Sequence, residues 1–180
     1  MLVDAAQPAG LLFVNGEFTA FHNKAWINTS VLSRQVVTSP SNKVCAYHRT
    51  RSMTVLTHLY LLFGGFKGPV KFVDSAFWGP SANIALLQGS GSVTFSACQF
   101  AQWGCSDGDS CGKPSSTMAA LDVEHGSLMV QGCDFAQEGS LQVRASSDIE
   151  GAVVMGSRLA GGSRISAEDK HKIQVGFNIE

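Results

Sequence analysis

Two carboxylates and an arginine carry the clearest chemical potential of this 180-residue sequence. Asp122 and Glu124 alternate with apolar residues, so on a β-strand both carboxylates project from the same face. One repeat later, Gln142 and Arg144 stand at the same two positions. This alignment predicts that Glu124 stacks on Arg144 and that Asp122 stacks on Gln142.

Such a group could bind the hydroxyls of a sugar, or act as acid and base across a glycosidic bond. General acid catalysis needs one carboxyl whose pKa is raised, usually by burial, and an exposed pair offers no source for that shift. The alternative is a solvated ion pair between neighbouring strands, worth about 0–1 kcal/mol. The spacing favours this structural interpretation for Asp122, Glu124 and Arg144.

Two tryptophans are candidates for stacking on sugar rings. Trp78 and Trp103 follow the Phe residues that end two copies of a repeat, beside polar turns. The flat apolar face of an exposed indole suits a pyranose ring. The alternative, which we favour, is that both side chains pack beneath the corner loops.

The five cysteines divide into two pairs and a remainder. Cys98 and Cys133 occupy the same position in two repeats, and stacked strands lie ~4.8 Å apart, within reach of a disulfide. The alternative, which we favour, is a pair of small buried residues. Cys105 and Cys111 bracket a polar insertion, 104–118, and could close it with a disulfide. No Cys-x-x-Cys pair is present, so we predict no structural zinc site.

The polar insertion also holds Asp107 and Asp109, which match half of a calcium-binding loop. The loop lacks the regular acceptor series and the terminal Glu of an EF-hand. The histidines are scattered and form no catalytic spacing with Ser, Cys or Asp. We therefore predict no metal site and no cofactor.

The element that must position these residues is a repeat. Residues 91–102 (GSVTFSACQFAQ) and 126–137 (GSLMVQGCDFAQ) share Gly-Ser-apolar-x-apolar followed by Cys-x-Phe-Ala-Gln, and looser copies begin at Gly10, Gly68 and Gly151. A period in the low twenties with strand-like alternation predicts an all-β domain of stacked coils over residues 1–180. Apolar pairs are predicted to face inward: Leu121/Val123, Leu128/Val130 and Val153/Met155.

The charge content and the length of the longest apolar run argue against two partners, nucleic acid and the membrane. Charged residues make up only 15% of the chain and the net charge is −1, so no clustered positive field is available for nucleic acid. The apolar run from Met53 to Phe66 is shorter than the ~20 residues that a membrane span needs, and His58 interrupts it. We predict neither a nucleic-acid partner nor a membrane span.

Residues 68–85 (GPVKFVDSAFWGPSANIA) and 91–103 (GSVTFSACQFAQW) resemble the C-terminal coils of the pectin lyase-like superfamily, which includes pectate lyases, polygalacturonases and rhamnogalacturonases. The resemblance implies a right-handed parallel β-helix of about five to six coils. It also implies a secreted protein whose partner is a polysaccharide. The superfamily's Asp-Asp pair is absent, so no catalytic residue can be assigned from the resemblance.

The resulting functional expectation is the C-terminal part of a secreted, carbohydrate-active protein, related to glycoside hydrolases or polysaccharide lyases, without a complete active site. The alternative is a non-catalytic or structural module that binds glycan or protein through the 104–118 loop and the face of Asp122, Glu124 and Arg144. No signal peptide is recognisable in residues 1–8, and the repeat begins at Gly10 without an end cap. We therefore expect the chain to be a fragment, or to lack its natural start.

Residues 44–67 contain no acidic residue and do not follow the repeat. They could supply a strand or helix packed on the coils. Alternatively, they could be a translated intron, because Val44-Cys45 can be encoded by the splice-donor-like hexamer GTRTGY and Leu56-Thr57 by the branch-point-like CTNAC. Removal of 44–67 would join a polar turn to the strand that begins after Gly68.

Sequencing of the mature transcript separates these two interpretations. The intron hypothesis predicts that the codon of Lys43 is followed directly by the codon of Gly68. A transcript that retains codons 44–67 in frame would contradict it.

Overall fold

The computed structural model describes residues 11–15, 17–19, 27–28, 59–63, 68–105 and 114–180, and these parts of the chain are almost entirely β-structure. Among them is one short 3-10 helix, η1 (Lys170–Lys172). The strands are β1 (Leu11–Val14), β2 (Glu17–Thr19), β3 (Ile27–Asn28), β4 (Leu59–Phe63), β5 (Val70–Val73), β6 (Ala76–Trp78), β7 (Asn83–Leu87), β8 (Ser92–Ser96), β9 (Gln99–Ala101), β10 (Ala119–Val123), β11 (Ser127–Gln131), β12 (Asp134–Phe135), β13 (Leu141–Ala145), β14 (Gly151–Met155), β15 (Arg158–Leu159), β16 (Ile165–Ala167) and β17 (Ile173–Gly176).

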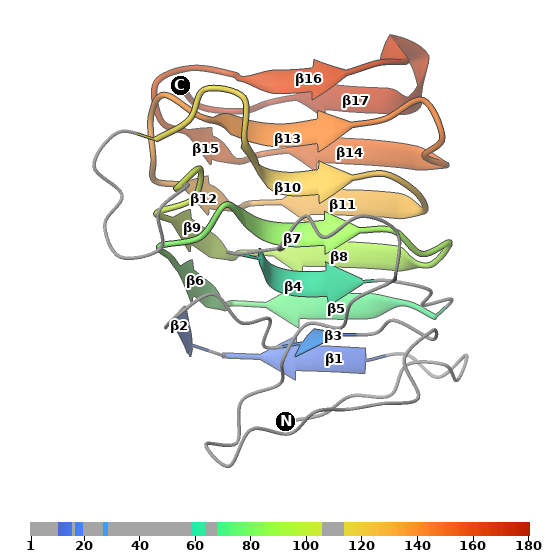
Figure 1. Cartoon of the computed structure of the whole chain (residues 1–180), viewed down its shortest axis with the longest axis horizontal. Coiled ribbons are helices and arrows are strands. Elements are labelled where there is room, and N and C mark those ends of the chain that lie inside the picture. Colours follow the sequence, from blue (N-terminus) through green and yellow to red (C-terminus); the bar gives the residue numbers. More distant parts are fainter. Residues whose placement is uncertain (1–10, 16, 20–26, 29–58, 64–67, 106–113) are drawn as a thin grey trace, which may run out of the picture.

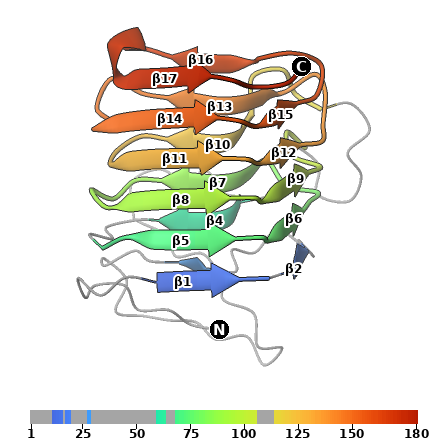
Figure 2. The same ribbon diagram turned by 180° about the vertical axis from the view of Figure 1, so that it is seen from behind.

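The strands form three parallel sheets, shown from opposite sides in Figures 1 and 2. Sheet A has the order β1-β5-β8-β11-β14-β17, sheet B the order β2-β6-β9-β12-β15, and sheet C the order β3-β4-β7-β10-β13-β16. From β4 onward, consecutive strands belong to sheets C, A and B in turn. The prediction of an all-β fold is confirmed, and the parallel sheets are compatible with a β-helix. A coil denotes one passage of the chain through the sheets.

The register between strands places the repeat copies directly on one another. Ser92 pairs with Ser127 in sheet A, and Phe100 pairs with Phe135 in sheet B. The side chains of Phe100 and Phe135 stack with ring centroids 4.7 Å apart, and those of Phe72 and Phe95 stack at 5.1 Å. These aromatic side chains are buried and fill the space between the sheets, where each pair adds to the free energy of area burial.

The inward pairs are predicted correctly in two of three strands. Leu121/Val123 and Leu128/Val130 are buried in the core. Val153/Met155 was predicted to face inward, and this is wrong: Ala152 and Val154 are buried, whereas Met155 is 38% exposed. Strand β14 is apolar at both alternate sets of positions, so its pattern does not specify which set faces the core.

Part of the out-of-pattern segment 44–67 forms a strand. Strand β4 lies between β3 and β7 in sheet C and pairs with both in parallel. The remaining residues of the segment lie outside the described residues, and the translated-intron hypothesis stays a prediction. The central part of the polar insertion 104–118, residues 106–113, also lies outside them.

A left-handed residue marks the corner between sheets A and B in each coil. The φ angles are 53° at Asn15, 49° at Asp74, 54° at Ala97, 61° at Gly132, 61° at Gly156 and 56° at Phe177. All of these amides except that of Phe177 donate to the last carbonyl of the sheet A strand in the next coil, at 2.9–3.2 Å. The corner therefore turns the chain and bonds it to its neighbour at the same time.

From Asp74 onward, the residues that follow the left-handed corners form a stacked row, which we call the corner ladder: Ser75, Cys98, Cys133, Ser157 and Asn178. The amide of Cys98 donates to Cys133 Sγ at 3.4 Å, that of Cys133 to Ser157 Oγ at 3.1 Å, and that of Ser157 to Asn178 Oδ1 at 2.9 Å. The carbonyls of the first four accept amides from the next coil at 2.8–2.9 Å. Each rung thus satisfies buried backbone groups of its neighbours.

The corner ladder confirms the favoured prediction for Cys98 and Cys133. Cys98 and Cys133 stack as the repeat predicts, but both are free thiols and no disulfide joins them. Their side chains are the small buried residues of the alternative interpretation. The hydrogen bond between the two thiols lowers the pKa of Cys98, and together with burial it raises the pKa of Cys133.

Substitution of Cys133 tests the ladder. Cys133→Val keeps an apolar side chain of similar size but leaves the amide of Cys98 without an acceptor, so we expect a loss of about 1–3 kcal/mol in the free energy of unfolding. Cys133→Ser keeps an acceptor and should lose less. Urea denaturation followed by circular dichroism measures both. Equal losses in the two variants would contradict the role given to the sulfur atom.

Candidate functional site

The outer face of sheet C carries a fixed ion pair. Asp122 of β10 and Arg144 of β13 are register partners, and Arg144 Nε donates to Asp122 Oδ1 at 2.9 Å while a terminal guanidinium nitrogen contacts Oδ2. Asp122 is 5% exposed, whereas the Arg144 side chain is 49% exposed. The hydrogen bond to Asp122 raises the pKa of Arg144, against the effect of burial, and the charges of Glu124 and Glu168 raise it further.

The pairing corrects the predicted stacking of Glu124 on Arg144 and of Asp122 on Gln142. Asp122 and Arg144 are 22 residues apart, so this coil is longer than the alignment of the repeat indicated. Glu124 instead accepts a hydrogen bond from Gln88 Nε2 at 2.8 Å, across to the preceding coil. Asp122 and Arg144 therefore pair with each other, whereas Glu124 and Gln142 have other partners.

Gln142 has a structural role. It is fully buried, its Nε2 donates to the carbonyl of Gly162 at 3.0 Å, and its Oε1 accepts the amide of Arg164 at 2.6 Å. These bonds hold the turn that precedes β16 against β13. Gln142 therefore has no free polar atom to offer to a ligand.

The two tryptophans differ in exposure, and neither takes part in the ion pair of Asp122 and Arg144. Trp103 is fully buried, packs edge-on against Phe135 at 6.0 Å, and donates from Nε1 to the carbonyl of Leu141 at 2.8 Å. Packing under the corner, the interpretation favoured for Trp103, is confirmed, because a fully buried indole offers no face to a sugar ring. Trp78 ends β6 in sheet B and is 43% exposed. It remains available for contact, on a different sheet from Asp122.

The polar insertion leaves and re-enters the body at one place. The amide of Ser115 donates to the carbonyl of Gly104 at 2.8 Å, which closes the base of the loop. Cys105 is buried and disulfide-bonded. Cys111, its predicted partner, lies outside the described residues.

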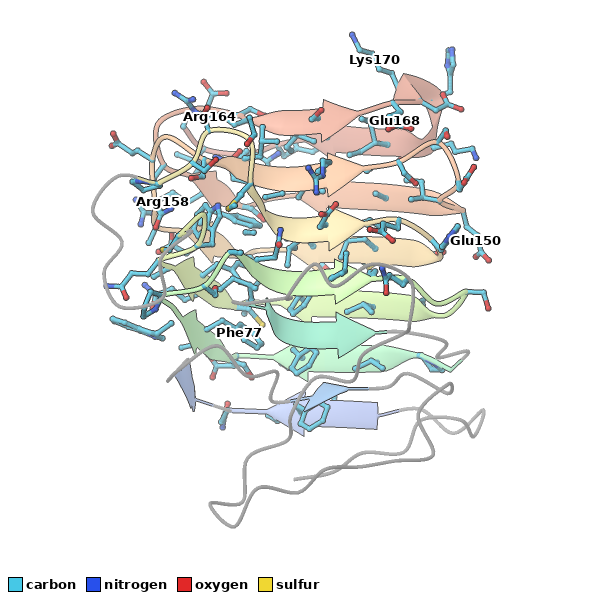
Figure 3. All side chains as sticks on the ribbon, in the orientation of Figure 1. Phe77, Glu150, Arg158, Arg164, Glu168 and Lys170 are labelled. Carbon is cyan, nitrogen blue, oxygen red and sulfur yellow. The ribbon has the colours of Figure 1, made fainter. Side chains whose placement is uncertain are left out.

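Sequence reasoning missed Gln88 and Glu168, which flank the ion pair. Gln88 bonds Glu124 from the coil before, and Glu168 follows β16 in the coil after, at the corner with sheet A (Figure 3). A register derived from the strand pairing of β7, β10, β13 and β16 would have found both. With Gln88 and Glu168 included, the candidate site contains hydrogen-bond donors and acceptors from four successive coils.

Within the described residues, no group of three or more His, Cys, Asp or Glu side chains could hold a metal ion. In the same parts of the chain, no helix is long and apolar enough to cross a membrane. No protein family, no curated protein and no solved structure matches this chain. The account of its function therefore rests on the chain's own residues.

Replacement of Arg144 tests the energetic role of the ion pair. Arg144→Met leaves the carboxylate of Asp122 nearly buried without its partner, and we expect a loss of about 1–2 kcal/mol, reduced by the solvent around the half-exposed guanidinium. The double variant Asp122→Leu/Arg144→Met should recover most of that loss, because no unpaired charge remains. Thermal and urea unfolding measure both effects.

The matched control is Arg158→Met. Arg158 forms an ion pair with Asp134 on sheet B at 2.7 Å, but the Asp134 side chain is 32% exposed, so water can replace the lost partner and stability should change little. A loss at Arg158 equal to that at Arg144 would contradict the importance of burial at Asp122.

Proposed function

We propose that this chain is a right-handed parallel β-helix of about five to six coils, and a non-catalytic module of a secreted, carbohydrate-active protein that binds polysaccharide through the outer face of sheet C. The cyclic order of strands through three parallel sheets supports the β-helix. The disulfide of Cys105 supports secretion, because disulfides persist in oxidising compartments.

The half-exposed guanidinium of Arg144 is the observation that carries the binding proposal. Asp122 fixes its orientation, and Gln88 and Glu124 lie beside it as a second hydrogen-bonded pair. Fixed donors next to fixed acceptors suit the hydroxyl groups of a sugar, each of which can donate and accept. Because the strands of successive coils lie ~4.8 Å apart, such groups recur along the axis of the stack.

The same contacts argue for binding rather than catalysis. Both oxygens of Asp122 are occupied by Arg144, whereas Glu124 accepts from Gln88 through Oε2 alone, so at most one of the two carboxylates could act on a substrate. A general acid must deliver a proton to the glycosidic oxygen, and a second carboxylate must reach the opposite side of the sugar. A carboxylate whose two oxygens bind one guanidinium has no free oxygen for either task.

Affinity electrophoresis through gels that contain neutral or acidic plant polysaccharides tests the proposal. The wild-type chain should be retarded by at least one polysaccharide without release of reducing ends. The variant Asp122→Leu/Arg144→Met, which keeps the packing of the face, should be retarded much less than the wild type. Retardation equal to wild type in this variant, or none in any gel for the wild type, would refute the sheet C site.

A further inference from the structure

A concave surface lies on the outer face of sheet A, the sheet that faces the reader in Figure 2. It is an open groove with a volume of about 520 Å³, within the range of small-ligand sites. Its floor runs across β8, β11 and β14, where Ser92, Ser127 and Gly151 are aligned by the strand register. None of the residues of the sheet C ion pair lines it.

The groove follows from the small residues that begin each repeat. Ser92, Ser127 and Gly151 have short side chains or none, and the next outward row holds the larger Thr94, Met129 and Val153. A methyl group added at Gly151 would meet only the carbonyl of Lys172, at 3.7 Å. The hollow is therefore a product of the Gly-Ser start of the repeat, carried through three coils.

The rim of the groove carries charges of both signs. Glu150 accepts a hydrogen bond from Ser127 Oγ at 3.0 Å, which fixes one carboxylate oxygen and leaves the other free for a ligand. Lys172 donates from Nζ to the carbonyl of Ser147 at 2.7 Å, and His171 stands next to it in η1. Figure 3 shows Glu150 at the corner where the chain enters sheet A.

We propose that this groove binds a neutral hexopyranose unit, as a second glycan site separate from the face of sheet C. Met129, which is 45% exposed, and Val153 supply an apolar surface for the C–H face of a sugar ring. The hydroxyls of Ser92 and Thr94, the amide of Gln174 and the carboxylate of Glu150 supply donors and acceptors around it.

The charges select against ionic ligands. An acidic sugar that approached Lys172 would also meet the carboxylate of Glu150, and a cationic ligand would meet Lys172 and His171. The hydroxyls of a neutral ligand can hydrogen-bond both to Glu150 and to the basic residues of the rim, and they bring no charge that would be repelled by either. The groove is open, so the binding expected is weak, with dissociation constants in the micromolar to millimolar range, about 10⁻⁶–10⁻³ M.

The experiment titrates the full chain with the neutral disaccharides cellobiose and maltose, and with the digalacturonate disaccharide, by isothermal calorimetry and ligand-observed NMR. Gly151→Phe places a ring in the groove and should weaken binding of the neutral disaccharide at least about tenfold. Gly151→Ala adds a methyl group in ordinary contact and should bind as the wild type does. Both residues suit a strand better than Gly, so neither should lower the melting temperature.

Two further variants make the result specific. Gln131→Phe adds the same ring on the same face of β11 but outside the groove, and it should leave binding unchanged. Asp122→Leu/Arg144→Met should reduce retention on polysaccharide gels and leave disaccharide binding unchanged, which separates the two sites. The proposal is overturned if neither neutral disaccharide binds at millimolar concentration, if digalacturonate binds more tightly, or if Gly151→Phe binds as tightly as Gly151→Ala.

Discussion

The bonding of one coil to the next at the corner between sheets A and B is the constraint on which the rest of the structure depends. At this corner a left-handed residue turns the chain, and its amide bonds the next coil. The following rung of the corner ladder then offers a side-chain acceptor to the coil before it. A non-glycine residue in this conformation costs about 1–2 kcal/mol. Ala97 and Asp74 adopt it nonetheless, so the interactions between coils must offset that cost.

Both proposed sites follow from the register that these bonds set. A shift of one residue between β10 and β13 would move Arg144 away from Asp122 and to the other face of the sheet. The same shift between β11 and β14 would fill the groove with Ala152 in place of Gly151. The binding surfaces are thus consequences of stacking, and each is assembled from residues of several coils.

The sequence predicted the stacked β-structure because identical patterns recur in consecutive coils. It did not predict the pairing of Asp122 with Arg144, because the number of residues in a coil depends on turns whose lengths vary without a clear pattern. It also placed Val153 and Met155 inside, since β14 is apolar at both sets of positions. The left-handed corner was not predicted, because Asp, Ala, Gly and Phe all occupy it.

Hydrogen exchange measured residue by residue by NMR tests the stacking of coils most directly. The amides of Asn15, Asp74, Ala97, Gly132 and Gly156 bond the next coil and should exchange far more slowly than exposed loop amides. The amide of Phe177 has the same left-handed conformation but no acceptor among the described residues, so it should exchange rapidly. Rapid exchange at all five bonded corners as well would contradict the stacking described here.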